Sequence, residues 1–362
     1  MLHHRLDGPS DAPLLVLGPA MGTTLDLWEP QLPAFSAFWR VLRFDLPGHG
    51  GSPSRPGVTL DELADEVLEL AGPGRFAYAG ISVGGQIGIA LAAAAPERID
   101  RLALLCTAAR IGTTEGWLDR AAQVRKDGMG PLSDTAPSRW FTPDFQAHAP
   151  FAEIMRGVDA EGYAAMCEAI AYFDGRDRLG RITAPTLVIS GAGDPTTPPA
   201  DGQALADGIP SAELEVLQNA SHLANVEQAP AVTRLLTGHL LPDRRGGGTR
   251  VRRAVLGDAH VDQAAAGTTD FTADFQDLIT RYAWGDIWTR PGLDRKARSC
   301  ITITALVARG HLDELAMHVR AALRNGLTPE EIKEVLLQSA IYCGVPAANS
   351  AFAVAQRVLA ES

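Results

Sequence analysis

Short apolar runs alternate with amphipathic helical patterns through the larger, N-terminal part of the chain. The runs occupy residues 13–17, 41–46, 75–79, 101–106, 185–190 and 212–217. Apolar strands that alternate with helices are typical of a parallel sheet whose two faces are covered. The pattern therefore predicts an α/β fold, closed by a helix over residues 229–240.

One long interval in this pattern contains no strand signal. Between about residues 113 and 180 the chain has helical segments rich in Ala, Met and aromatic residues, among them Trp117, Trp140 and Tyr163. An insertion of this kind can supply the apolar walls of a pocket above a sheet. We interpret it as a helical lid.

The pattern changes after residue 243. Residues 244–250 contain three consecutive glycines beside arginines, which is typical of a flexible linker. Only helical patterns follow, and residues 328–331 supply an N-cap threonine, a proline and two acids, which together signal a helix start. The sequence thus predicts an α/β domain over residues 1–243, a linker, and an all-α domain over 251–362 whose long apolar faces favour a homo-oligomer.

Composition narrows the function classes. The chain has 362 residues and a formal net charge of −11, which argues against nucleic acid as a partner. Its four cysteines form no C-x-x-C pair, so neither a metal site nor a redox motif is predicted, and nothing in the sequence calls for a cofactor. No run approaches the length of a membrane span and the N-terminus lacks an apolar signal core, so we expect a cytoplasmic protein without a membrane partner.

A G-x-S-x-G motif at residues 80–84 lies between an apolar run and a helical pattern. In a strand–turn–helix context such a turn lifts the serine hydroxyl above the sheet edge, where it can attack a carbonyl. Alone, the motif is common by chance and better fits a simple glycine-rich turn. It makes Ser82 a candidate nucleophile that needs partners.

Two residues supply these partners in the order serine, acid, histidine. Asp194 and His222 each follow a predicted strand, so both should lie at the same sheet edge as Ser82. Each has a simpler interpretation, because Asp194 precedes a proline in a possible turn and His222 could be a surface histidine. His49 is a rival base, but it precedes the motif and better fits a role in holding the turn at residues 47–52.

Acyl transfer by Ser82 also needs donors for a tetrahedral oxyanion. The backbone N–H of Val83 is one candidate, because this residue follows the nucleophile. The second should come from the loop after the first apolar strand, where Pro19 has no N–H. We therefore expect Thr23 to provide it.

The all-α region has a polar stripe on one predicted helix. His311, Glu314 and His318 are spaced by three and four residues, which places them on one face. The opposite face must bury apolar residues, so periodicity alone favours a solvated side over an active site.

Several motifs in residues 1–240 resemble the 3-oxoadipate enol-lactonases, which are α/β-hydrolases of aromatic-ring catabolism. The most specific are Thr-Ala-Ala-Arg-Ile-Gly at 107–112 and Arg-Trp-Phe-Thr at 139–142. The resemblance implies hydrolysis of an enol lactone to 3-oxoadipate, with Trp140 on the lactone ring. Arg139 or Arg110 could bind the substrate carboxylate, although a surface salt bridge explains either equally well.

Residues 251–261, 284–293 and 331–349 resemble 4-carboxymuconolactone decarboxylase. Peroxidase-type members of that superfamily carry C-x-x-C-x-x-x-H on the helix of His318. Here His311 and Glu314 stand at the two cysteine positions, which excludes thiol redox chemistry and leaves acid–base chemistry.

This second resemblance implies a decarboxylation without cofactor, in which the lactone ring accepts the electrons. His318 and Glu314 would stabilise the dienolate oxygen and protonate carbon, with His311 as an auxiliary group. The substrate carboxylates could be held by arginines and the site walled by tryptophans, although the tryptophans serve nearly as well as core aromatics. The candidates are Arg290, Arg298, Arg281, Trp288 and Trp284.

The product of the second implied reaction is the substrate of the first. The sequence therefore predicts a bifunctional enzyme that acts on small lactones. The alternative is a lone serine esterase or lactonase that carries a catalytically silent helical oligomerisation domain.

Overall fold

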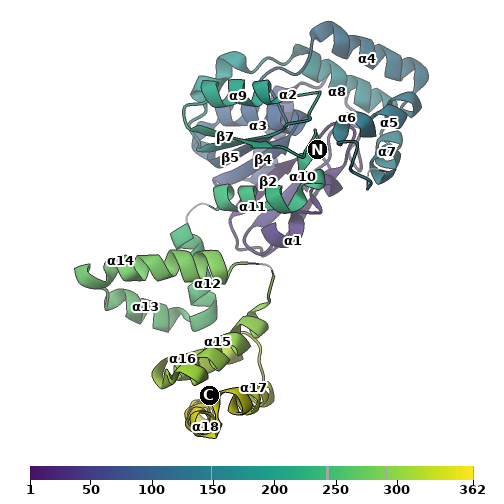
Figure 1. The fold of residues 1–362 in the computed structure, drawn as a ribbon. Helices are drawn as coiled ribbons and strands as arrows, with labels where there is room; N and C mark the ends of the chain where they lie inside the picture. Colours follow the sequence, from purple (N-terminus) through teal and green to yellow (C-terminus); the bar gives the residue numbers. More distant parts are fainter. Residues whose placement is uncertain (148, 242–243, 291, 362) are drawn as a thin grey trace. The chain divides into compact units, whose positions relative to one another are not determined.

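The computed structural model describes residues 1–147, 149–241, 244–290 and 292–361. The chain forms two compact units, Met1–Leu241 and Pro242–Ser362. Both are drawn in Figure 1.

The first unit is built on a sheet of seven strands within its described residues, in the order β1-β3-β2-β4-β5-β6-β7. β1 runs antiparallel to β3, and the other neighbouring strands are parallel. All residues of β4, the middle strand, are buried, as expected for a strand covered on both faces. The strands are β1 (His4–Asp7), β2 (Leu14–Gly18), β3 (Arg40–Phe44), β4 (Phe76–Ile81), β5 (Ile99–Leu105), β6 (Thr186–Gly191) and β7 (Ala212–Leu217).

Helices cover both faces of this sheet. Figure 1 shows α2, α3 and α9 on one side and α11 on the other. A capping box between Thr59 and Glu62 starts α2, and nearly every residue of α3 is buried. The elements are η1 (Leu25–Trp28), α1 (Leu32–Phe35), α2 (Leu60–Ala71), α3 (Val83–Ala94), η2 (Pro96–Arg98), α9 (Pro199–Gly208), α10 (Ala224–Glu227) and α11 (Ala229–Leu240).

A helical insertion separates β5 from β6, where the sequence predicts a lid. Figure 1 shows its helices gathered at one end of the sheet. They are α4 (Thr114–Asp127), α5 (Gly130–Thr135), α6 (Pro137–Trp140), α7 (Ala149–Arg156), α8 (Ala160–Tyr172) and η3 (Arg176–Arg181). The predicted α/β fold of the first unit is confirmed.

The described elements of the second unit are all helical, which confirms the predicted all-α region. Two apolar clusters hold it together, one around Val319 and Leu336, the other around Val255 and Trp284. The helices are α12 (Arg244–Leu256), α13 (Asp258–Ala266), α14 (Asp270–Ile279), the π-helical η4 (Thr280–Ile287), α15 (Arg295–Arg309), α16 (Leu312–Arg324), α17 (Pro329–Cys343) and α18 (Val345–Ala360).

Large apolar side chains remain exposed on this unit. Phe271 is 95% exposed and Tyr342 is 78% exposed. The homo-oligomer stays a prediction. Sedimentation velocity, which measures the mass of the species in solution, can test it. No helix in the described ranges is long and apolar enough to cross a membrane.

The prediction of a flexible linker over residues 244–250 is wrong. α12 begins at Arg244, so this segment is helical, while residues 242–243 lie outside the described residues. Gly248 is buried, and a Cβ atom there would lie 2.0 Å from the backbone oxygen of Thr280 in η4. The missing side chain lets two helical segments approach closely, which explains a glycine that composition alone assigns to a linker.

Replacing Gly248 by alanine should therefore destabilise the second unit, although alanine is the better helix former. We expect a loss of about 1–3 kcal/mol in the free energy of unfolding, measured by urea denaturation, because the Cβ atom overpacks the contact with Thr280. Gly247→Ala is the matched control, because no atom lies within 4 Å of a Cβ built at Gly247. Equal stability of the two variants would contradict the close approach.

Candidate active sites

The G-x-S-x-G turn lies between β4 and α3 and holds Ser82 in a strained backbone conformation. Its φ of 56° and ψ of −122° fall in a region that non-glycine residues rarely adopt. The flanking glycines are required by space: a Cβ at Gly80 would lie 2.2 Å from Gly84 O, and a Cβ at Gly84 would lie 2.5 Å from Gly18 C. Ser82 is thus fixed at the start of a helix, at the carboxyl end of the central strand.

The loops after β6 and β7 bring two further residues to Ser82. His222 Nε2 lies 2.9 Å from Ser82 Oγ, and His222 Nδ1 lies 2.8 Å from Asp194 Oδ2. All three side chains are buried. A histidine bonded on one side to a serine hydroxyl and on the other to a carboxylate can act as general base toward that serine.

Asp194 is held by the residues that follow it. Its Oδ1 accepts from the backbone N–H groups of Thr196 and Thr197 at 2.8 and 3.1 Å, and its Oδ2 accepts from Thr197 Oγ1 at 2.7 Å. Burial disfavours the charged form, but bonds to His222 and Thr197 outweigh it and hold the pKa of the Asp194 carboxyl below its usual value. The carboxylate is therefore charged and oriented at neutral pH.

The loop after β2 does not offer the N–H that the sequence predicts. Thr23 donates its backbone N–H to Ala20 O at 3.3 Å and its hydroxyl to the same oxygen at 2.7 Å, so this prediction is wrong. Gly22 donates its N–H to His49 Nε2. The N–H of Met21 has no acceptor among the described residues, and Met21 lines the same cavity as Ser82.

Val83, the other predicted donor, is the first residue of α3. The first N–H groups of a helix have no carbonyl partner within it, so the Val83 N–H is available to a ligand. Val83 and Met21 are therefore the two candidate oxyanion donors.

His49 supports the loop after β2 through its side chain. Its Nδ1–H donates to Pro47 O at 2.9 Å, which leaves Nε2 to accept the N–H of Gly22 at 2.9 Å. Burial lowers the pKa of His49 to about 4, against the smaller opposing effects of the Pro47 carbonyl and the carboxylates of Asp45 and Asp159. Because His222, and not His49, is hydrogen-bonded to Ser82, His49 is not the base. The bond between His49 and Gly22, in the loop after β2, was not predicted.

A cavity of about 290 Å³ opens above Ser82 and His222. Trp140, Met155 and Tyr163 of the lid line it, and the Trp140 ring lies 3.2 Å from a Cβ built at Gly22. The lid thus supplies apolar walls directly over the nucleophile, as the sequence predicts for this insertion.

Two arginines line the same cavity. Neither Arg139 nor Arg120 forms an ion pair with a carboxylate among the described residues. Burial, and next the charge of Arg120, lower the pKa of Arg139. Two cations without a counter-ion in a pocket wall are suited to bind an anionic group of a ligand.

Arg110, the sequence alternative to Arg139, does not line this cavity. It pairs with Asp174 at 3.3 Å and donates to Thr114 Oγ1 at 2.9 Å, which is the simpler interpretation as a surface salt bridge. Arg120 was not predicted, because the sequence does not show which face of α4 turns toward the site. Its guanidinium lies 4.7 Å from the Trp117 ring centroid.

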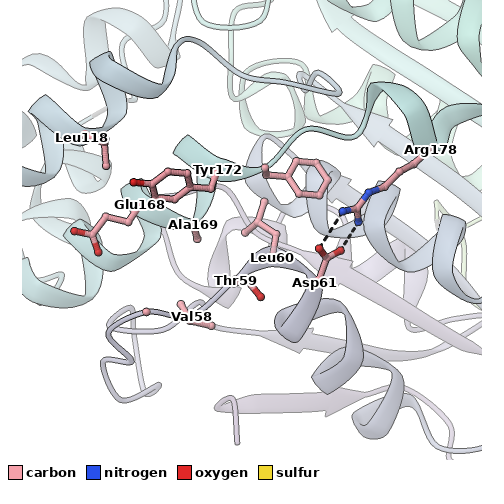
Figure 2. Close-up of a pocket in the computed structure, with 11 residues that line it drawn as sticks. Val58, Thr59, Leu60, Asp61, Leu118, Glu168, Ala169, Tyr172 and Arg178 are labelled. Carbon is pink, nitrogen blue, oxygen red and sulfur yellow. Dashed lines mark hydrogen bonds and ion pairs between the residues drawn. The ribbon is translucent and has the colours of Figure 1, made fainter.

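A second cavity of about 330 Å³ lies between α2 and the lid helices α4 and α8, and Figure 2 shows its lining. Its charged groups are already paired, Asp61 with Arg178 and Glu168 with Arg125. It contains none of the predicted site residues, so the candidate acyl-transfer chemistry lies at the other cavity, beside Ser82.

In the second unit the predicted stripe lies at the start of α16. His311 is the residue before the helix and is exposed, as is Glu314, whereas His318 is partly buried. Burial, and next the charge of His260, lower the pKa of His318 to about 4, and Glu314 opposes this effect. His318 is therefore uncharged at neutral pH.

His260 and two arginines were not predicted. His260 lies in α13, and burial together with Arg252 and Arg324 lowers its pKa. Arg252 donates to Gln276 Oε1 at 3.0 Å and Thr280 Oγ1 at 3.3 Å, and its buried Nε has no partner in the described part of the chain. Only the place of His260 and Arg252 in one resembling segment could have signalled them. The packing of α12 and α13 brings Arg252 near His260, and His260 lies near His318.

The other predicted residues of this unit do not gather around His318. Arg298 donates to Arg290 O at 2.7 Å, and no described contact joins either arginine to His318. Arg281 pairs with Asp277. Trp288 packs on Trp284, with ring centroids 5.1 Å apart, beside the cluster around Val255, which fits the core role. No group of three or more potential metal ligands occurs among the described residues.

The mainly parallel sheet, the strained turn at Ser82 between β4 and α3, and the helical insertion after β5 define the first unit as an α/β hydrolase. The chain belongs to the alpha/beta hydrolase family, whose model matches residues 15–235. A second model, of the carboxymuconolactone decarboxylase family, matches residues 273–357.

Each part of the chain is also similar in sequence to a particular enzyme. The first part is 40% identical to 3-oxoadipate enol-lactonase 2 of Acinetobacter baylyi, over 64% of this chain and 89% of that protein. The last part is 48% identical to 4-carboxymuconolactone decarboxylase of the same organism, over 31% of this chain and 83% of that protein. The chain is therefore an enzyme with one part homologous to an enol-lactonase and one to a decarboxylase.

A solved structure agrees with the first likeness. The enol-lactonase from Burkholderia xenovorans LB400 superposes with a TM-score of 0.63 and 42% identity, covering 66% of this chain and 95% of that one. Both family resemblances drawn from the sequence are confirmed.

The buried, uncharged His49 predicts a specific sensitivity to acid. Its pKa of about 4 lies below the value of 6.5 for a free histidine, so the unfolded chain takes up a proton over this interval and the folded chain does not. Stability contributed by neutral His49 should be complete above pH 6.5 and be lost as the pH falls toward 4.

Urea unfolding at pH 7, 6, 5 and 4 measures this effect against His49→Asn, which cannot titrate. We expect the wild-type protein to lose up to about 3 kcal/mol more than the variant over this range. The same pH dependence for both proteins would show that His49 does not carry it.

Proposed function

We propose that the protein catalyses two consecutive reactions, decarboxylation of 4-carboxymuconolactone and hydrolysis of the resulting 3-oxoadipate enol-lactone to 3-oxoadipate. The observation that carries this proposal is the presence, in one chain, of a part homologous to each enzyme. The product of the decarboxylation is the substrate of the hydrolysis. This relation supports one pathway function better than two unrelated activities.

The geometry around Ser82 supports a two-step acyl transfer. His222 Nε2 takes the proton of Ser82 Oγ as the oxygen attacks the lactone carbonyl, and Asp194 stabilises the imidazolium. The tetrahedral oxyanion is bound by the N–H groups of Val83 and Met21. The ring C–O bond then breaks, His222 returns the proton to the enolate, and the enol becomes a ketone. Water activated by His222 hydrolyses the acyl-enzyme.

The cavity supports a substrate that carries a carboxylate beside its lactone ring. Arg139 and Arg120 are the groups that bind the carboxylate, because both line the cavity and neither has a counter-ion among the described residues. Trp140 packs on the ring. The bonds from arginine to a carboxylate are charge-assisted and gain strength away from water.

The decarboxylation, which we assign to the second unit, requires stabilisation of a dienolate and transfer of one proton. When the bond to the departing CO2 breaks, its electrons move through the ring double bond into the lactone carbonyl, so the substrate is its own electron sink. Glu314 and His318 are the groups that stabilise the dienolate oxygen and pass a proton, taken in net from water, to the ring carbon beside the carbonyl, assisted by His311. Arg252 and Arg324, which act on the pKa of nearby His260, supply positive charge for a dianionic substrate.

The rival function is a lone hydrolase whose helical unit only oligomerises the chain. The exposed aromatic residues of that unit favour an oligomerisation role. The two functions differ in one measurable product, CO2.

Single substitutions should separate the two activities. Ser82→Ala is expected to lower enol-lactone hydrolysis by a factor of about 10⁴ or more, because the nucleophile is lost, while CO2 release from 4-carboxymuconolactone continues. His318→Asn should lower CO2 release from 4-carboxymuconolactone, while enol-lactone hydrolysis continues. Undiminished CO2 release from His318→Asn and from matching variants of Glu314 and His311 would contradict the assignment of the second site.

The carboxylate-binding role separates two arginines that the sequence alone could not. Arg139→Gln should raise KM for the enol-lactone about tenfold or more, as expected for loss of a hydrogen bond to a charged group, with a smaller change in kcat. Arg110→Gln is the control and should leave KM unchanged, because Arg110 is paired with Asp174 outside the cavity. A larger rise in Arg110→Gln would reverse the assignment.

A further inference from the structure

The segment Arg-Trp-Phe-Thr at residues 139–142 is bonded to the loop that carries His222. The backbone N–H of Leu223 donates to Trp140 O at 2.9 Å. On the other side of the histidine, Ser221 Oγ lies 3.4 Å from Arg139 O and 3.2 Å from Gly193 O. The backbone carbonyl groups of Arg139 and Trp140 therefore contact the residues on either side of His222.

A single carboxylate joins the same two segments a second time. Glu227, the last residue of α10, accepts from the backbone N–H of Thr142 at 2.8 Å and from the Thr142 hydroxyl through Oε1. Its Oε2 accepts the backbone N–H of Ser221 at 2.7 Å. Glu227 forms no ion pair among the described residues, so these three donors are its described polar partners.

This arrangement fixes His222 relative to the lid. The residues before and after the histidine are each tied to the lid segment, one through Glu227 and Thr142, the other directly to Trp140. Hydrogen bonds to a charged acceptor are shorter and stronger than neutral ones, and Glu227 is partly buried. A shift of Arg139 or Trp140 therefore displaces the loop that orients the imidazole.

We propose that Glu227 is a positioning residue that couples the substrate-binding segment of the lid to the catalytic histidine. It does not line the cavity, so it acts through Thr142 and Ser221. Substrate held by Arg139 and Trp140 is thereby kept in register with the imidazole that takes the Ser82 proton. The identity of the bound group, a carboxylate, rests on the proposed function; the coupling itself rests on the hydrogen bonds within the first unit.

The test compares two substrates in Glu227→Gln. A glutamine keeps one acceptor oxygen and turns an NH2 group toward an N–H donor, so one side of the clamp is lost. We expect kcat for 4-nitrophenyl acetate, which has no carboxylate, to fall about tenfold, because the imidazole of His222 is less well oriented. For the enol-lactone we expect kcat/KM to fall about a hundredfold with a raised KM, because the bound substrate is also displaced relative to His222.

Two further variants make the result specific. Thr142→Val removes the hydroxyl donor alone and should shift both constants in the same direction by less, and it carries the comparison should Glu227→Gln not fold. Glu153→Gln, which removes an exposed lid carboxylate paired with Arg156, should leave both substrates unchanged. Far-UV circular dichroism and thermal melting establish that each variant is folded.

The outcomes are distinct. Unchanged constants for both substrates in folded Glu227→Gln would overturn the clamp, and equal losses with an unchanged KM for the lactone would overturn its coupling to Arg139. A wild-type protein that hydrolyses the ester but not the enol-lactone would end the proposed function, while the ester rates of the variants would still decide whether Glu227 positions His222.

Discussion

The hydrolase site depends on one strained residue. Ser82 adopts a positive φ that costs about 1–3 kcal/mol for a side chain of this kind, and it does so only because its surroundings leave no alternative. The Ser82 N–H donates to Leu105 O at 3.0 Å, and Thr107 Oγ1 donates to Ser82 O at 2.6 Å. Glycines 80 and 84 let α3 approach β2 and β4 closely enough to hold the turn.

The parallel sheet places the other residues of the site around Ser82. Loops from the carboxyl ends of β2, β6 and β7 reach the same edge, so they deliver Met21, Asp194 and His222 to Ser82 without any of these being close in sequence. The lid then adds apolar walls and two arginines. In a chain with a net charge of −11, such local cations are what an anionic substrate requires.

Local patterns were enough to predict part of this arrangement. The turn at Ser82 and the loops of Asp194 and His222 follow from strand order and from motifs within a few residues. Thr23 could not be assigned correctly, because the bond from its N–H to Ala20 O depends on the conformation of the loop. Gly248 was assigned to a linker, since only the approach of Thr280 reveals why a side chain is excluded. Arg120 and His260 depend on how helices pack, which periodicity does not determine.

The two units are linked by their proposed chemistry, in which a decarboxylation supplies the ester that a serine hydrolase opens. Incubation of the whole protein with 4-carboxymuconolactone, with CO2 and 3-oxoadipate followed separately, tests this link most directly. We predict that both products appear, in equal final amounts. Absence of CO2, from a protein that still converts supplied enol-lactone to 3-oxoadipate, would contradict it.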